Sequence, residues 1–337
     1  MACAHVRRGA CAGNVREWHA RVWRGADAAH IHEWCGTYAG YAYDMGTLPG
    51  YDRIIRLNTV QNEVGDLLQT LKTMVKGNVE WRNQIARLAW FELIKKSRGA
   101  ILSWAWFFIK PAIYIFCFWF ALDVGLRGAG ATATEGVPYI LWLSSGIIPW
   151  FFMQEMMGGG SDVLHKFSYL VKKIKFPLSG ISSIFTGAEM IVQLMLQVAL
   201  FVMYFICGMT FDLYLLQVPL ALLLMFIFWD MFSILFSQIT AFSKDVANLV
   251  KALSTPFFWL SGVIFDVRTI PFDWIQVLMQ YNPVTFFCTV FRYAFCDKIW
   301  FWEDPGLCSG FIVVFVVTFI ATLFVYKHLN QEVADVL

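Results

Sequence analysis

The chain has 337 residues, of which 58% are hydrophobic and only 15% are charged, and its formal net charge is +2. A water-soluble domain of this length needs far more charge to cover its surface, so the composition excludes an ordinary soluble protein. The apolar residues gather in runs that approach the ~20 residues a helix needs to cross a ~30 Å hydrocarbon core. Because these runs are continuous and do not alternate, they indicate helices and not the strands of a membrane barrel.

Residues 1–53 differ from the rest, since they are rich in Arg, His, Trp, Ala and Gly and lack a hydrophobic period. No apolar core follows the basic residues, so a secretory signal is not expected. His30, His32 and Cys35 lack a second ligand pair at zinc-finger spacing, and we expect no metal site there. The simplest interpretation is a disordered or non-native leader ahead of a later start, such as Met45 or Met74.

Residues 54–100 predict two helices at the membrane interface. In residues 54–75 apolar side chains recur at spacings of three and four, with polar residues between them, which is the pattern of an amphipathic helix. This helix could lie on the membrane or pack on a partner. Residues 79–98 form a second helical stretch that carries five Lys and Arg residues into the first span. We expect 54–100 to be cytoplasmic.

The hydrophobic runs predict an all-α membrane domain over residues 101–337. The six predicted transmembrane helices cover residues 101–122, 138–157, 181–208, 213–241, 249–265 and 307–326. The fifth is short, and the mixed, aromatic segment 266–300 that follows contains Pro271 and Asn282-Pro283. We expect that segment to form a short helical cap at the outer surface between spans five and six.

Lys and Arg in the connecting segments predict the orientation. With both termini cytoplasmic, thirteen basic residues between Lys76 and Lys327 fall on the inner side, and only Arg127, Arg268, Arg292 and Lys298 fall outside. An excess of basic residues marks the cytoplasmic side. The sequence therefore predicts a multi-pass plasma (inner) membrane protein with both ends inside.

The loop between the second and third spans predicts a short amphipathic helix. Ser161 or Asp162 could cap it, and Val163, Leu164, Phe167, Leu170 and Val171 give it one apolar face. A cytoplasmic helix of this kind has the shape needed to dock on a soluble partner. The alternative, equally compatible with the pattern, is that its apolar face rests on lipid or on this protein's own helices.

Four ionisable residues, Lys110, Glu155, Glu189 and Asp230, fall in or at the edges of spans. An unpaired charge in a bilayer is costly, so each should face protein or water. A polar pathway is one interpretation. The favoured one is mutual pairing, for example of Lys110 with one of the acids, or an interfacial position for Glu155.

The sequence predicts no catalytic site on this chain. It has no G-x-x-x-x-G-K-[S/T] phosphate loop, no H-E-x-x-H and no G-x-S-x-G. Aromatic residues are dense in the first and fifth spans, where contact with lipid and interfacial belts is the ordinary explanation. Stacking of sugar rings in a glycan channel is the alternative for such residues.

Several segments in register resemble the ABC-2-type permeases that export polysaccharides. In the first span the matching positions are Glu92-Leu93, Lys96, Arg98, Leu102, Trp106 and Pro111, with Ser103 replacing a usual Gly and Lys110 a common Gln. Further matches are Gly146 to Phe152, Gly160-Ser161, Leu170 to Lys173, Phe176-Pro177, Asp245, Leu260 to Phe265 (with Gly262 in place of Pro), Ile270-Pro271, Asn282-Pro283, Phe291-Arg292 and Glu332 to Asp335. The resemblance covers residues 80–337.

The resemblance implies a function for several residues. A homodimer of permeases would pair with two separate ATP-binding-cassette ATPases, which hold the ATP and Mg. The cargo would be a polysaccharide such as O-antigen, teichoic acid or capsule precursor on a polyprenyl-pyrophosphate lipid. Residues 161–172 would form the ATPase-coupling helix through Ser161, Val163, Leu164, Phe167, Leu170, Val171 and Lys172. Lys95, Lys96 and Arg98 would contact pyrophosphate or anionic inner-leaflet lipid, and Trp106, Tyr114, Phe257, Phe258 and Trp259 would line a glycan channel.

Two alternatives remain open from the sequence. The first keeps the architecture but changes the cargo to a drug, lipid or peptide. The second is a membrane-bound glycosyl or acyl transferase, which would need a water-facing cluster of acids or His that the sequence does not reveal. A partner nucleic acid is not expected.

Overall fold

The computed structural model describes residues 51–98, 103–127, 136–173 and 176–336, and the leader predicted over 1–53 lies almost wholly outside these ranges. The chain divides into two units, residues 1–64 and 65–337, and the second contains the helix bundle. Its described residues form helices joined by short connections, with no β-strand among them. The all-helical prediction is therefore confirmed for this part of the chain.

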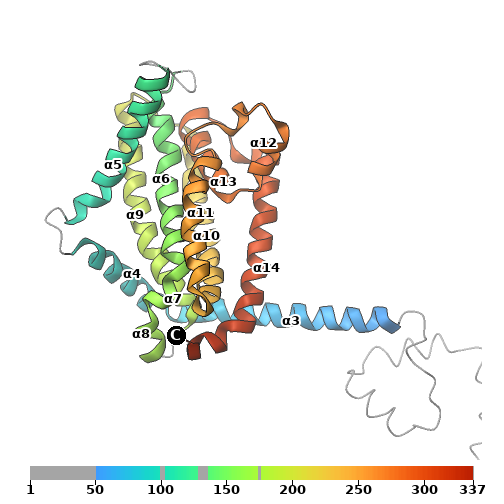
Figure 1. Ribbon diagram of the computed structural model, residues 1–337. Helices are drawn as coiled ribbons and strands as arrows, with labels where there is room; N and C mark the ends of the chain where they lie inside the picture. The colour runs from blue at the N-terminus through green and yellow to red at the C-terminus, as the bar shows by residue number, and fades with distance from the viewer. Residues whose placement is uncertain (1–50, 99–102, 128–135, 174–175, 337) are drawn as a thin grey trace, which may run out of the picture. The chain divides into compact units, whose positions relative to one another are not determined.

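Long helices run side by side through the second unit (Figure 1). They are α5 (Trp106–Trp119), which a π-helical segment continues over Phe120–Arg127, α6 (Tyr139–Gly158), α9 (Leu178–Ile206), α10 (Gln217–Phe242), α11 (Lys244–Leu260) and α14 (Pro305–Val336). In the described residues four segments are long and apolar enough to cross a membrane: Ser103–Gly125, Leu178–Ile206, Leu213–Phe242 and Pro305–Asn330. These correspond to the first, third, fourth and sixth predicted spans.

The helix α6 occupies the position of the second predicted span, and most of it is enclosed by other helices. Fifteen of its 20 residues are buried, including Trp142, Gly146 and Trp150. A helix that is apolar on all sides buries itself among other helices. In agreement, α6 packs against α5, α9, α11 and α13.

The fifth predicted span differs from the observed helix. The prediction of 249–265 is displaced, because α11 begins at Lys244 and ends at Leu260. Residues after Leu260 turn sharply at Gly262, whose φ of +67° lies in the left-handed region that glycine tolerates. Helix α11 has 17 residues, fewer than most membrane-crossing helices.

The segment after α11 folds into short helices, as predicted. They are α12 (Asp273–Gln280), α13 (Pro283–Arg292) and a π-helical turn, Tyr293–Asp297. Asn282 caps α13, since its Oδ1 accepts the Val284 N–H at 2.9 Å and Pro283 follows at the first helical position. Helices of eight and ten residues are too short to span, which confirms that 266–300 contributes no full crossing.

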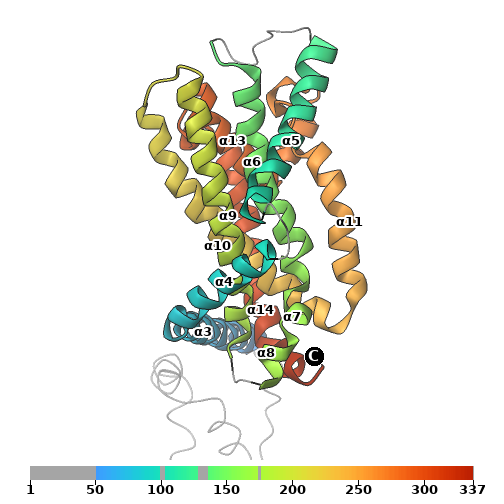
Figure 2. The same cartoon turned by 90° about the vertical axis from the view of Figure 1, so that its left-hand side faces the viewer.

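The predicted interface helices are present as α3 (Tyr51–Glu80) and α4 (Arg82–Ser97). In Figure 2 the end of α3, α4, α7 (Val163–Lys166) and α8 (Ser168–Lys173) gather at one end of the bundle. The C-terminal part of α14 reaches the same end, where Lys327 Nζ lies 2.8 Å from Asp66 Oδ2 of α3. The polar connections before and after the bundle therefore meet on one side.

Arg292 fastens the cap to the bundle. Its side chain is 4% exposed, and its guanidinium donates to the carbonyls of Gly262 at 2.5 Å, of Phe265 at 3.1 Å, and of Val263. Its Cζ also lies 3.7 Å from the centre of the Trp142 ring, a cation–π contact. A Cβ on Gly146 would stand 2.5 Å from Arg292 Nη2, so only glycine leaves room for the guanidinium.

We predict that Arg292→Met destabilises the purified protein by about 3 kcal/mol or more, because it leaves buried carbonyls without donors at about 1–3 kcal/mol each. The thermal unfolding of the variant in detergent measures this loss. Lys76→Met is the control, since Lys76 and its partner Glu80 are both exposed. Equal unfolding temperatures for the Arg292 variant and the parent would contradict the role of this contact.

Candidate functional site

The segment predicted to be a coupling helix is folded in two pieces. A 3-10 turn, Gly160–Asp162, leads into α7, and the backbone leaves the helical region at Phe167 (φ −106°, ψ 21°) before α8 begins. The prediction of one helix over 161–172 is therefore wrong. Phe167 is 4% exposed, so its ring lies in the core at this break. Neither Ser161 nor Asp162 caps α7 through its side chain.

The apolar face of this segment rests on the protein's own helices. Ser161, Val163, Leu164, Phe167 and Leu170 are all buried. In contrast, Tyr169 is 53% exposed, and Lys166 and Lys172 also reach the surface. The side chains free to meet a partner are thus those on the polar side of the segment, while Val171 is half-buried.

Three contacts hold the segment against the bundle. Ser233 of α10 donates to the Gly160 carbonyl at 2.8 Å, and Lys251 of α11 lies 3.2 Å from Asp162 Oδ2. Lys166 pairs with Glu92 of α4, a carboxylate that is only 6% exposed. A displacement of residues 160–173 would therefore act on α4, α10 and α11 through these three contacts.

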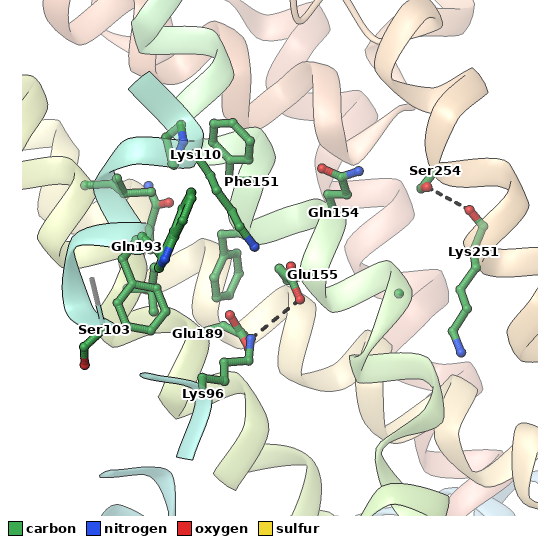
Figure 3. A pocket seen from close by; sticks show the side chains of 17 residues that line it. Lys96, Ser103, Lys110, Phe151, Gln154, Glu155, Glu189, Gln193, Lys251 and Ser254 are labelled. Atoms are coloured by element: carbon green, nitrogen blue, oxygen red, sulfur yellow. Dashed lines mark hydrogen bonds and ion pairs between the residues drawn. The ribbon is translucent and has the colours of Figure 1, made fainter. Parts of the chain in front are cut away.

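A cavity of about 900 Å³ opens above this segment, between α4, α5, α6, α9 and α11 (Figure 3). Its polar lining includes Lys96, Lys110, Glu155, Glu189 and Gln193. Its apolar lining includes Trp106, Phe107, Phe151, Phe152, Val192 and Leu196. A chamber with convergent charged groups and aromatic walls is the usual form of a small-molecule site.

Lys96 is the electrostatic centre of the cavity floor. Its ammonium pairs with Glu189 and lies 3.7 Å from Glu155 Oε2, as Figure 3 shows. Burial lowers the pKa of Lys96, but the two carboxylates raise it more, so the net pKa lies above the ordinary 10.5. Because the pKa of Lys96 is higher in the folded protein than in the unfolded chain, protonated Lys96 contributes its full stability below the unfolded-state pKa of about 10.5. That contribution is lost only as the pH rises past this value and through the folded-state pKa. Lys96 therefore stays protonated throughout the physiological range.

The ring of Phe185 joins this pair to the coupling segment. Lys96 Nζ lies 5.6 Å and Lys166 Nζ 4.8 Å from the ring centre. A Cβ on Gly159 would stand 2.5 Å from Phe185 Cζ, so the glycine at the end of α6 makes room for the ring. Lys166, Phe185 and Lys96 thus form a continuous path from the coupling segment to the cavity.

Two of the three basic residues predicted to contact pyrophosphate form ion pairs with acidic residues. Lys95 lies 3.8 Å from Glu92 Oε2, and Lys96 is paired as described. Arg98 is exposed at the end of α4. The sequence analysis named Glu92, Glu155 and Glu189 but did not pair them with these lysines.

Of the four ionisable residues predicted in or near spans, Glu189 and Glu155 pair with Lys96 and not with Lys110. Asp230 is held by hydroxyl groups: Ser183 and Thr186 each donate to it at 2.9 Å. Ser183 in turn accepts from Asn78 of α3 at 3.3 Å. This chain of hydrogen bonds ties α3 to α9 and α10 through the interior.

The predicted channel aromatics separate into groups. Tyr114 and Phe258 have ring centres 5.9 Å apart, and Phe258 adjoins Trp259 at 5.5 Å. Phe258 is buried, whereas Trp259 is 54% exposed. Trp106 lies instead in the cavity wall, and Phe257 is half-buried. The structure therefore does not bring all five into one lining.

Sequence reasoning named Glu92 only as a motif position and missed its pairing with Lys95 and Lys166, and it did not single out Phe185 or Gln193. Glu92 precedes Lys95 and Lys96 by three and four residues, a spacing that places acid and base on one helix face and was a usable signal. Gln193 is a polar residue inside an apolar run, also visible in sequence. Nothing in the sequence pointed to Phe185, because its role depends on two lysines distant along the chain.

We predict that Lys96→Met destabilises the protein more than the double change Lys96→Met with Glu189→Gln. The single change leaves Glu189, which is 4% exposed, as an uncompensated charge, whereas the double change removes both charges. Thermal unfolding of the single and double variants in detergent measures the difference. Lys76→Met, which breaks an exposed pair with Glu80, is the control and should change little. A double variant less stable than Lys96→Met would contradict this arrangement.

Comparison with known proteins places these features in one family. The ABC-2 type transporter family matches residues 83–296. An O-antigen export system permease protein RfbA of Myxococcus xanthus is 21% identical over 267 residues, covering 78% of this chain and 98% of that protein. Two O-antigen export system permease proteins RfbA of Klebsiella pneumoniae are 22% and 23% identical, each covering 73% of this chain and 92% of the relative.

The family match extends from α4, through the cavity helices α5, α6, α9 and α11, to the π-helical turn after α13. It thus includes every residue of the cavity lining and the whole coupling segment. The four apolar helices agree with a multi-pass protein of the plasma (inner) membrane. The chain belongs to the ABC-2 type transporter family.

Proposed function

We propose that this chain is the permease subunit of an ATP-binding-cassette exporter that moves a polyprenyl-pyrophosphate-linked polysaccharide from the cytoplasm across the plasma membrane. The observation that carries the proposal is that the chain aligns with 98% of the length of an O-antigen export permease. The large cavity with charged floor and aromatic walls supports an amphiphilic cargo. Energy would come from a separate ATPase, and this chain would act in transport and not as an enzyme.

In this proposal six helices cross the membrane, with α6 and α11 added to the four apolar segments. Helix α6 has 20 residues, enough to cross, and most of its surface contacts other helices of the bundle. The meeting of α3 with the end of α14 supports placing both termini on one side. The excess of Lys and Arg in the connections at that end favours the cytoplasm.

The proposed assembly is a homodimer of permeases with two ATPases. The exposure of α5 favours a further protein partner in the membrane plane. Only 6% of the most apolar stretch of Ser103–Gly125 is buried within this chain. The ATPase would meet the exposed side of residues 160–173. ATP-driven movement there would reach the cavity through Lys166, Phe185 and Lys96.

We predict that Tyr169→Asp abolishes capture of the ATPase while leaving the permease folded. Tyr169 is 53% exposed on the coupling segment, so a charge there disturbs a docking surface without filling the core. Affinity purification in mild detergent from the native host, with mass spectrometry of the copurified proteins, measures this.

The matched control is Phe211→Asp, because Phe211 is 64% exposed in the connection beyond the far end of α9. It should retain the ATPase. Leu164→Asp should instead reduce the yield of folded protein, since Leu164 is 1% exposed. Recovery of equal ATPase with Tyr169→Asp and with the parent would contradict docking through this segment.

The six-span arrangement predicts opposite labelling of two introduced cysteines. Ser168→Cys in α8 should be protected from a membrane-impermeant maleimide in intact cells, and Thr269→Cys in the predicted outer cap should be labelled. Four crossings alone would leave the 126–177 connection on the outer side, so labelling of Ser168→Cys would contradict the crossing of α6. The parent chain, with its native cysteines, provides the background mass shift.

A further inference from the structure

The lysines that line the cavity differ in their partners. Lys96 is paired with Glu189 and Glu155, and Lys251 lies 3.2 Å from Asp162. Lys110 has no carboxylate within 4 Å among the described residues. The cavity therefore carries one cation that the described part of the chain does not neutralise.

Lys110 is placed where such a charge requires a counter-ion. It is the eighth residue of the apolar segment Ser103–Gly125, roughly 10 Å along the helix from its start at 1.5 Å per residue. Figure 3 shows its side chain extending from α5 into the cavity. A charge at this depth is costly unless it meets an anion or water.

A second polar group in the same cavity is also unsatisfied. The Gln193 side chain is 1% exposed, and neither its Nε2 nor its Oε1 has a hydrogen-bond partner among the described residues. Gln193 lies on α9, on the cavity wall to which Glu189 also belongs. Buried amides almost always form hydrogen bonds, so this one indicates a missing partner.

The apolar walls of the cavity indicate that the ligand also has an apolar part. Phe151, Phe152, Val192 and Leu196 line the cavity with aromatic and aliphatic carbon. An anion that is attached to an apolar chain would satisfy both parts of the lining. A free inorganic anion would leave the apolar part unused.

We propose that this cavity binds the phosphate-bearing headgroup of a lipid, with Lys110 and Gln193 as the groups that contact the phosphate and the apolar wall receiving the first part of the hydrocarbon chain. This inference rests on the proposed function in one respect, namely that the lipid is the carrier of the exported polysaccharide. It moves the phosphate contact from Lys95 and Lys96, which already have carboxylate partners, to Lys110, which has none among the described residues.

Binding to the purified permease in neutral detergent, without ATPase, tests the proposal. The probes are a polyprenyl pyrophosphate, phosphatidylglycerol and the uncharged polyprenol. We expect the polyprenyl pyrophosphate to bind at least about tenfold more tightly than the polyprenol, as one charge-assisted hydrogen bond supplies. Lys110→Gln should remove that advantage, and Lys110→Arg should keep most of it.

Two further variants separate direct contact from damage to the fold. Lys251→Gln is the matched control, because Lys251 lines the same cavity but has a carboxylate partner, and it should bind as the parent does. Gln193→Leu should weaken binding of the phosphate-bearing probes and leave the polyprenol unaffected. Each variant is compared at equal thermal stability and equal elution volume.

The probes also separate the sources of the phosphate. Tighter binding of the polyprenyl pyrophosphate than of phosphatidylglycerol supports a carrier site, and equal, Lys110-dependent binding of both supports a site for membrane phospholipid. Parent-like binding by Lys110→Gln, or equal binding of polyprenol and pyrophosphate, would overturn the proposal. Because the assay contains no ATPase, failure to capture an ATPase would count against the proposed transport function alone.

Discussion

The lipid solvent is the constraint on which the rest of this structure depends. A span has no water to satisfy its polar groups, so a polar group there is costly unless it finds a partner. Glu189 finds Lys96, Asp230 finds the hydroxyls of Ser183 and Thr186, and Arg292 finds backbone carbonyls. Each of these contacts joins elements that are distant in sequence. The pairing of buried polar groups therefore also fixes the positions of the helices relative to one another.

The same constraint explains why the coupling segment is integrated into the bundle. Its apolar side chains fill the space between α6, α9 and α10, and its charged side chains pair with Glu92 and with Lys251. Only a narrow polar surface around Tyr169 stays outside. A segment built in this way is well suited to transmit displacement, because its first residues contact α10 and α11 and Lys166 contacts α4.

The cavity and the coupling segment are connected by aromatic as well as ionic contacts. Phe185 lies between the ammonium groups of Lys96 and Lys166, and Gly159 provides the space for its ring. Polarised rings attract cations most strongly where water is scarce. The contact therefore gains importance where the two lysines are partly shielded from water at this end of the bundle.

The sequence by itself determined the helical class, the positions of four apolar spans, the interface helices and the absence of a full crossing in 266–300. These follow from the length and continuity of apolar runs, which are local properties. Only the tertiary structure decided the end of α11, the break at Phe167 and the pairing of Lys96 with Glu189. Arg292 binds the backbone carbonyls of the turn that follows Leu260. The side chain of Phe167 is buried in the core. The partner of Lys96 is set by the packing of α4 on α9, which brings together residues 93 positions apart. Such contacts depend on how helices pack, and no local pattern encodes that.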